Sequence, residues 1–322
     1  MPELVCLGII VVDVWGRPVA DWPARGTLGL VEEIGLGIGG CAANCAVDYA
    51  RLGGEVAVMG CVGQDVLGDI VLRLLTEAGV QLSVQRTDRA STSGTIVAVH
   101  PDGERTFLHA TGANGHVDPA RLDLDLIRAT PLLALLGALV MPGFDGEPQA
   151  RVLAEAQAAG VTTLVDTVYN DAGHWMQVLR PVLAHADIFV PSINEARQLT
   201  GLREPPEIAA ALLAEGPGLV GIKLGPEGSY FRTAGQELWV PAYPVEVVDG
   251  NGAGDAFVAG FLWGLRRGWD LESTARFASA VGGLCTTAVG TTAGVRSYAE
   301  TVCMIEAWEG RPWNPGTAEA VV

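Results

Sequence analysis

Lysine is almost absent from this chain of 322 residues. Of its 20 basic residues, 19 are arginine and one, Lys223, is lysine. A phosphate-binding loop of the Walker A type ends in Gly-Lys-Ser/Thr, whereas this lysine lies in Ile222-Lys223-Leu224. The segment 220–223 is followed by neither the His-Arg-Asp nor the Asp-Phe-Gly motif of protein kinases. The sequence therefore excludes both of these nucleotide-binding classes.

Positive charge is also scarce overall, because the formal net charge is -17. A field of this sign repels nucleic acid and anionic membrane surfaces, and no basic stripe offsets it. We therefore expect neither nucleic acid nor membrane as a partner. A small anion can still bind where backbone N–H groups point at it.

Long apolar runs, a leader segment and paired cysteines are missing as well. The longest apolar run, residues 131–141, is too short to cross a bilayer. Residues 1–3 lack the basic start of a signal peptide, and none of the six cysteines forms a Cys-x-x-Cys pair. These absences predict a cytoplasmic protein with reduced thiols.

Apolar segments alternate with amphipathic ones along most of the chain. This alternation predicts one α/β domain over residues 1–322, with a mostly parallel central sheet and helices on both faces. Two β-rich excursions, at about 12–38 and 94–114, predict a small β-sheet lid over one edge. A hairpin turn is expected at 101–104 within the second excursion. Further along we expect a helix at 118–128, strands at 228–233 and 237–247, and long helices at 254–266 and 271–287.

The most informative segment is Asp249-Gly250-Asn251-Gly252-Ala253-Gly254-Asp255, which follows an apolar strand and opens a helix. Three small residues, 252–254, leave their N–H groups accessible to phosphate oxygens, and a helix N-terminus adds partial positive charge. Asp255 is expected in the first helical turn beside this anion site. The alternative is an ordinary turn before a capped helix.

Several further polar residues stand at expected turns. Asp13 ends the first strand, and ligands of α/β sheets bind at the carboxyl ends of strands. A glycine pair, Gly39-Gly40, precedes a helix that carries Asn44. The run of glycines at 35–40 also hints at a dinucleotide loop, but it lacks the Gly-x-Gly-x-x-Gly spacing.

Taken together, these segments resemble the ribokinase-like (PfkB) carbohydrate kinase family. Residues 249–255 match the Asp-Thr-x-Gly-Ala-Gly-Asp signature except that Gly250 replaces threonine, and residues 39–44 resemble the first signature. The motifs occur in family order from about Asp13 to Val295. The resemblance implies a ribokinase-like fold and transfer of the γ-phosphate of ATP to a hydroxyl of a sugar or sugar acid. It also implies that Asp255 is the catalytic base and that Gly252, Ala253 and Gly254 form the anion hole.

The same resemblance implies the remaining site residues. For the sugar they are Asp13, Gly39, Gly40, Asn44 and Asn114, and for the nucleotide Lys223, Gly225, Gly228 and Ser279. Glu195 would organise Mg²⁺ through water, although Ser192 replaces the usual asparagine and Ser-x-x-Glu is also a helix-capping box. Asp249, with the loop 290–295, would hold a monovalent cation such as K⁺.

Three points stay open on the sequence alone. A homodimer through the lid is expected only by analogy. A phosphorylated sugar would need a pair of arginines, to which Arg105 could contribute. The alternatives to a sugar kinase are a nucleoside kinase of the same superfamily, a non-catalytic sugar-binding regulator on the kinase fold and, third, a dinucleotide-dependent oxidoreductase.

Overall fold

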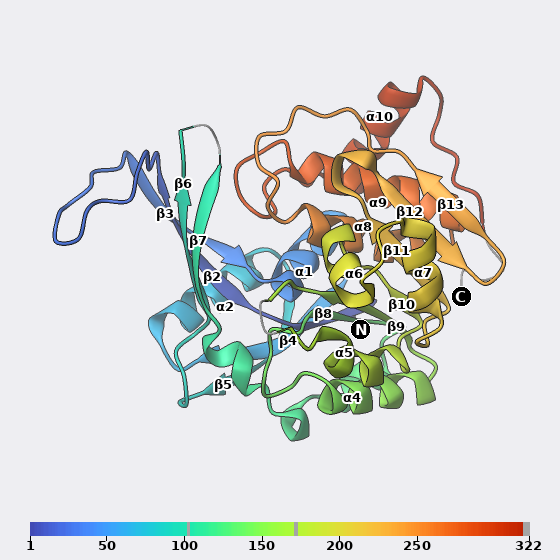
Figure 1. The fold of residues 1–322 in the computed structure, drawn as a ribbon, viewed down its shortest axis with the longest axis horizontal. Coiled ribbons are helices and arrows are strands. Elements are labelled where there is room, and N and C mark those ends of the chain that lie inside the picture. The colour runs from blue at the N-terminus through green and yellow to red at the C-terminus, as the bar shows by residue number, and fades with distance from the viewer. Residues whose placement is uncertain (102–103, 171–172, 318–322) are drawn as a thin grey trace.

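The structure is a computed structural model that describes residues 1–101, 104–170 and 173–317. Within this part of the chain, the strands form two sheets, one of nine strands and one of four. The four-stranded sheet stands away from the main body at one edge (Figure 1). This arrangement confirms the predicted α/β class with a small second sheet.

The main sheet is parallel except at one end. Its order is β13-β12-β11-β10-β9-β8-β1-β4-β5, and β12 and β13 are the antiparallel strands. The parallel strands are β1 (Leu4–Gly8), β4 (Val56–Gly63), β5 (Gln81–Thr87), β8 (Leu132–Ala138), β9 (Thr162–Thr167), β10 (Ile188–Phe189) and β11 (Leu219–Lys223). The antiparallel strands are β12 (Ser229–Thr233) and β13 (Glu237–Val240). Because the chain runs outward from β1 in both directions, the strand order reverses between β1 and β8, which is where α/β sheets bind ligands.

Helices cover both faces of this sheet (Figure 1). One face carries α1 (Cys41–Arg51), α2 (Val66–Glu77), α8 (Ala253–Arg266), α9 (Leu271–Cys285) and α10 (Tyr298–Glu309). The other carries α3 (Leu124–Arg128), α4 (Glu147–Ala158), α5 (Trp175–Leu183), α6 (Ile193–Thr200) and α7 (Pro205–Leu213). Short 3₁₀ turns are η1 (Gly112–His116), η2 (Pro119–Arg121) and η3 (Gly225–Glu227).

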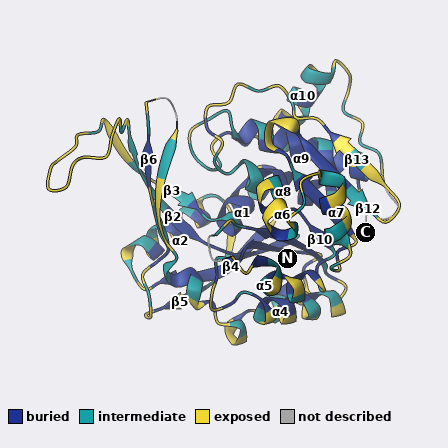
Figure 2. Ribbon diagram, viewed as in Figure 1, coloured by how far each residue is buried: buried dark blue, intermediate teal, exposed yellow. Residues whose placement is uncertain are grey.

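The strands between these layers are apolar on both sides. In β1, Leu4 and Cys6 pack into one core, while Val5 and Leu7 pack into the other. All four side chains are fully buried. Figure 2 shows the central strands of the main sheet in the colour of buried residues. This two-sided burial is why the segment appears as a continuous apolar run in the sequence.

The two faces of the small sheet differ in the rows around Asp13. The sheet consists of β3 (Glu33–Gly39), β2 (Val11–Arg17), β6 (Gly94–Val99) and β7 (Arg105–Ala110), in that order. One cross-strand row contains Asp13, Thr95 and His109, and the next row on the same face is apolar, with Trp15, Val97 and Phe107. The row between these two points to the opposite face and is also apolar: Leu36, Val14, Ile96 and Leu108. The first face therefore offers polar groups beside an apolar surface.

Some expected boundaries were wrong. The helix expected at 118–128 is shorter, since 119–121 form a 3₁₀ turn and α3 begins at Leu124 after Asp123 caps its N-terminus. The strand expected to reach residue 247 ends at Val240, because Pro241 and Pro244 cannot donate to a ladder. The hairpin expected at 101–104 joins antiparallel β6 and β7, but residues 102–103 lie outside the described part of the chain.

One long helix was missed. α10 begins with a capping box between Ser297 and Glu300, which the sequence signals but which no prediction used. Among the described residues, no helix is long and apolar enough to cross a membrane.

Candidate active site

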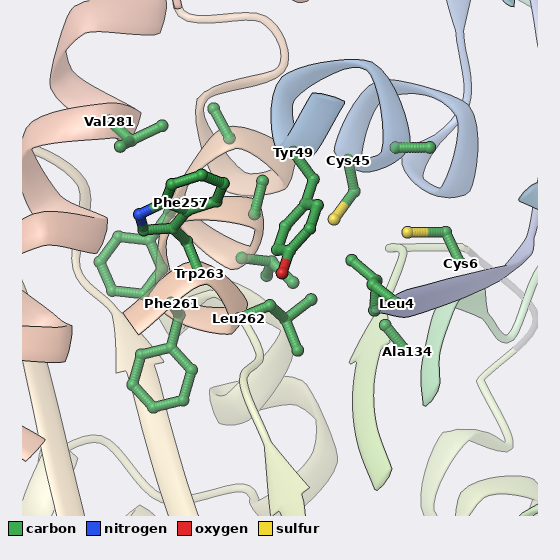
Figure 3. Close-up of a cluster of buried hydrophobic side chains, with 14 of the residues drawn as sticks. Leu4, Cys6, Cys45, Tyr49, Ala134, Phe257, Phe261, Leu262, Trp263 and Val281 are labelled. Carbon is green, nitrogen blue, oxygen red and sulfur yellow. The ribbon is translucent and has the colours of Figure 1, made fainter. Parts of the chain in front are cut away.

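The site begins with the packing of α1 against α8. Tyr49 of α1 meets Trp263 of α8 edge to face, with ring centroids 5.5 Å apart. Figure 3 shows these two rings within the apolar cluster that joins the helices. Their contact brings together the N-terminal halves of the helices, where Asn44 and Asp255 lie. Asn44 Nδ2 donates a hydrogen bond of 2.8 Å to Asp255 Oδ2.

The turn before α8 is shaped by Gly252. This residue has φ of 75°, and a Cβ atom added to it would lie only 1.9 Å from the carbonyl oxygen of Thr291. No other residue type fits that position without moving the backbone. The turn exposes the first N–H groups of a 14-residue helix, and Asp255 lies in its first turn. An anion at this point would face both the free N–H groups and the positive end of the helix dipole.

The Asp255 carboxyl lies among polar groups in an otherwise apolar region. Burial raises its pKa above the ordinary value, while hydrogen bonds from Asn44 and Cys41 and the charge of Lys223 oppose that rise. A raised pKa makes this carboxylate a stronger base than an ordinary aspartate. Cys41 is a contact that the sequence analysis did not anticipate.

Asp13 lies against the glycine pair as expected. A Cβ atom added to Gly39 would lie 2.5 Å from an Asp13 carboxylate oxygen, so only glycine permits this approach. Burial raises the pKa of Asp13 to about 6, and Asp255 adds to the rise, while Thr95 and Arg105 oppose it. The two aspartates are therefore close enough to influence each other's protonation.

Lys223 is buried and paired at the carboxyl end of β11. Its Nζ lies 2.5 Å from Asp166 Oδ2 at the end of β9. Burial lowers the pKa of Lys223, but Asp166, Glu195 and Asp255 outweigh it and raise the pKa above its ordinary value. The lysine therefore remains a cation close to the start of α8, where a Cβ on Gly254 would lie 3.4 Å from its Nζ.

Glu195 belongs to the same charged group but also caps a helix. Its Oε2 accepts a hydrogen bond of 2.8 Å from Ser192 N, and the reciprocal bond completes the capping box that the sequence predicts. Over the described ranges of the chain, no group of three or more His, Cys, Asp or Glu side chains is arranged to hold a metal ion. A metal ion held mainly by water and substrate phosphates remains compatible with Glu195, since Mg²⁺ commonly binds in that way.

Two cavities flank the turn at 249–254. The first, of about 460 Å³, lies beside the small sheet and is lined by Asp13, Arg105, Asp249 and Asn251 among others. The second, of about 530 Å³, lies beside α8 and α9, and it is lined by Gly250, Ala253 and Gly254. The four residues predicted to contact the nucleotide all line this second cavity: Lys223, Gly225, Gly228 and Ser279. We call the first cavity the small-sheet cavity and the second the α8–α9 cavity.

An ion pair connects the small sheet to this turn. Arg105, at the start of β7, pairs with Asp249, whose side chain is fully buried while that of Arg105 is 10% exposed. Asp249 Oδ1 also accepts from Asn251 N at 2.9 Å, and its Oδ2 accepts from Gly290 N at 2.6 Å. Both carboxylate oxygens therefore face donors. The predicted monovalent-cation role of Asp249 concerns carbonyl oxygens rather than this carboxylate, so it stays a prediction.

Asn114 is the sugar-site candidate placed least clearly. Its Oδ1 accepts a hydrogen bond of 3.0 Å from Ile10 N, and it is almost fully buried. Its Nδ2 has no hydrogen-bond partner within the described residues. Its part in sugar binding stays a prediction.

Asp166 is the charged site residue that the sequence analysis missed, although its position at a strand end was a usable signal.

Comparison with known proteins agrees with these motifs. Residues 1–297 match the family described as pfkB family carbohydrate kinase. A 2-dehydro-3-deoxygluconokinase from Bacillus subtilis is 30% identical over 278 residues, which cover 82% of this chain and 85% of that protein. An aminoimidazole riboside kinase from Salmonella typhimurium is 32% identical over 269 residues, covering 78% and 82% of the two chains.

The fold is shared with solved structures. A ribokinase from Arabidopsis thaliana, complexed with ribose and ATP, superposes with a TM-score of 0.85 at 24% identity, covering 95% of this chain and 99% of that one. This likeness confirms the predicted ribokinase-like fold. Because the family match extends over most of the chain, the protein belongs to the pfkB family of carbohydrate kinases and is a phosphotransferase with an alcohol group as acceptor.

Proposed function

We propose that this kinase transfers the γ-phosphate of ATP to a hydroxyl of a sugar or sugar acid, with Asp255 as the base. The observation that carries the proposal is the position of Asp255 in the first turn of α8. This carboxylate is buried, held by Asn44 and adjacent to free helical N–H groups, and the turn that precedes it lies between two cavities. Phosphoryl transfer needs little more than such positioning and charge stabilisation.

The acceptor binds in the small-sheet cavity. Asp13, which lines this cavity, accepts hydrogen bonds from sugar hydroxyls, and the backbone at Gly39 and Gly40 beside it allows close approach. Asn114 offers its Nδ2, which is unpartnered among the described residues, and Asn44 acts through the hydrogen bond by which its Nδ2 holds Asp255. Arg105 lines the same cavity and can exchange Asp249 for an anionic group of the substrate. This favours a sugar acid, which is the substrate class named for the Bacillus subtilis relative. A second arginine, Arg51, also lines the cavity.

ATP binds in the α8–α9 cavity. Gly225 and Gly228 leave room beneath the nucleotide, Lys223 meets a phosphate as a point charge, and Ser279 lies beside the base. The triphosphate then points toward the N–H groups of residues 252–254. These groups stabilise the charge on the moving phosphoryl group.

Asp255 accepts a hydrogen bond from the reacting hydroxyl and takes its proton as the new O–P bond forms and the bond to the β-phosphate breaks. In a loose transition state the proton leaves late, so a base of modest strength suffices. Mg²⁺, when bound, would neutralise phosphate charge, and Glu195 would hold it through water.

The small sheet acts as a lid over the acceptor. We assign the lid to about 12–38 and 94–114 within a single domain of residues 1–322. Closing over the site excludes water from the reacting groups. The outer, apolar face of this sheet is exposed, which supports a homodimer formed through the lid. The six free cysteines support a cytoplasmic location.

The second candidate is a nucleoside kinase, which the similarity to a riboside kinase favours. The non-catalytic regulator and the oxidoreductase are not retained, since the family match makes the chain a kinase. ADP release should be measured with 2-keto-3-deoxygluconate, fructose, ribose, adenosine and inosine. We expect turnover with a sugar or sugar acid. Turnover with adenosine or inosine alone would favour the second candidate.

Asp255→Asn tests the base directly, because asparagine keeps the shape but cannot take a proton. We expect kcat to fall by about 10³-fold, within the range for loss of a general base, while sugar binding changes little. ADP release gives kcat, and calorimetric titration gives the sugar dissociation constant. Turnover close to that of the wild type would overturn the assignment.

A further inference from the structure

An acidic side chain lies buried one helical turn after Asn44. Asp48 is in α1, is fully buried, and neither of its carboxylate oxygens has a hydrogen-bond partner among the described residues. An unpaired carboxylate in such surroundings costs several kcal/mol relative to water, so the neutral acid is favoured. Burial indeed raises the pKa of Asp48 well above its ordinary value. A neutral acid carries an O–H donor that needs an acceptor.

Such an acceptor exists on the same face of the same helix. Asn44 uses Nδ2 to hold Asp255, but its Oδ1 is buried and has no donor within the described chain. Residues four apart are neighbours on a helix surface, and side chains tilt toward the helix N-terminus. Asp48 therefore extends back toward Asn44. Within α1, which the structure describes in full, the buried side-chain oxygens and nitrogens without a partner are Asn44 Oδ1 and the two carboxylate oxygens of Asp48.

We propose that Asp48 is a positioning residue that donates a hydrogen bond from its neutral acid to Asn44 Oδ1 and so keeps Nδ2 turned toward Asp255. The proposal rests on the role of Asp255 in the proposed function. An amide side chain can present either its oxygen or its nitrogen, and a donor on one side decides which way it turns.

The groups that face Asp48 from neighbouring elements do not offer a better partner. They are Arg51 and Cys45 on α1, Cys6 on β1, Asp255 on α8 and Cys285 on α9. Arg51 favours the charged carboxylate, but its Nη1 donates to the carbonyl oxygen of Thr292. Asp255 and Cys6 both oppose a negative charge on Asp48.

The consequence for catalysis has a defined sign. A hydrogen bond from Asn44 lowers the pKa of Asp255 against the effect of burial. If Asp48 is absent, the amide can turn and present its oxygen to Asp255, and the pKa of the base then rises. At low pH, protonation of Asp255 lowers kcat, and this fall is the acid limb of the plot of kcat against pH. The acid limb would move to higher pH.

The experiment compares Asp48→Ala and Asp48→Asn with the wild type, using the best substrate from the ADP-release panel. Asp48→Ala removes the donor, and we expect the acid limb to shift up by about one pH unit, which lowers kcat by about tenfold at pH values on the limb itself. Asp48→Asn restores a donor of the same shape and should remain within about threefold of the wild type. Val71→Ala, a buried change on α2, is the control and should leave the limb in place.

A double-mutant cycle shows whether Asp48 acts through Asn44. In the Asn44→Ala background, Asp48→Ala should no longer move the acid limb, because the group that it orients is gone. If Asp48→Ala does not fold, Asp48→Leu replaces it, since it fills the space without a donor. An unchanged limb in the alanine or leucine variant, or an equal shift in the Asn44→Ala background, overturns the proposal.

The two levels of the hypothesis fail in different ways. If Asp255→Asn turns over normally, the proposed function itself is wrong. If Asp255→Asn is inactive but the Asp48 variants keep the wild-type limb, only the role of Asp48 is wrong. A purely structural Asp48 would change the melting temperature while leaving the limb unmoved, and that result also counts against the proposal.

Discussion

At the scale of single residues, burial and pairing together set the charge of each site group. Asp13, Asp166 and Asp255 all have a raised pKa because burial disfavours their charged form. Lys223 has a raised pKa for the opposite reason, since the surrounding carboxylates outweigh its burial. The site therefore keeps Lys223 as a cation among acids, of which Asp13 and Asp166 can bind protons near neutral pH.

This has a testable effect on substrate capture at low pH. With a pKa of about 6, Asp13 gains a proton as the pH falls from 7 to 5 and loses acceptor capacity for sugar hydroxyls. Capture of the sugar should therefore weaken, and its dissociation constant measured by calorimetric titration should rise between pH 7 and 5. Asp13→Asn, which cannot take a proton, should remove that rise. An identical rise in the variant would show that Asp13 does not titrate in this way.

The pair of Lys223 and Asp166 allows a stability test. Removing only the lysine leaves a buried carboxylate without its partner, so Lys223→Met should lower the free energy of unfolding by about 3 kcal/mol. Lys223→Met combined with Asp166→Leu should recover more than half of that loss, because no charge then remains unpaired. Urea denaturation measures both. Equal or greater destabilisation in the double variant would contradict the pairing argument.

At the scale of elements, the start of α8 depends on one residue of the turn that precedes it. Gly252 has a positive φ and contacts the backbone of the loop at Thr291, whereas a Cβ on Gly250 would meet nothing within 4 Å. The replacement of the family threonine by Gly250 therefore falls where the chain tolerates side chains. Gly252, which leaves no room for a side chain, does match the family signature.

These two glycines form a matched pair for mutation. Gly252→Ala should destabilise the protein by about 2 kcal/mol or more and lower kcat at least about 100-fold, because the turn must shift away from the anion site. Gly250→Ala should change the free energy of unfolding by less than about 1 kcal/mol. Thermal denaturation and ADP release test both. Comparable losses in the two variants would mean that the turn is not shaped by Gly252.

At the scale of the whole molecule, the small sheet presents an exposed apolar face. Ile96 is 51% exposed and Leu108 is 55% exposed, and they are paired across β6 and β7. Ile34 on β3 adds to the same face. Exposed apolar patches of this kind are common at protein interfaces.

We therefore expect a dimer in solution and expect Leu108→Glu to convert it to monomer, since a buried unpaired charge opposes association. Val66→Glu changes a still more exposed apolar residue, on α2, and is the control. Sedimentation velocity at several concentrations distinguishes the species. A wild type that stays monomeric would remove the dimer from the account, and dissociation by both variants would indicate a nonspecific effect of added charge.

The sequence by itself determined the family and the layered α/β class, and it predicted the residues of the proposed site. Local patterns carry these, because apolar runs predict strands buried on both faces, and the motif residues at 39–44 and 249–255 are adjacent in the chain. Element ends were less certain, as with α3 and β13, since caps and prolines decide them within one or two residues.

Only the tertiary structure decided which distant groups meet. Arg105 with Asp249, Lys223 with Asp166, and Asn44 with Asp255 are each separated by many residues, and no periodicity links them. The same holds for Asp48, which the sequence presents as one more acid on a helix and which the packing of α1 against α8 buries. Hydrophobic pattern is a local property, whereas charge pairing and burial depend on the folded arrangement of all the elements around a residue.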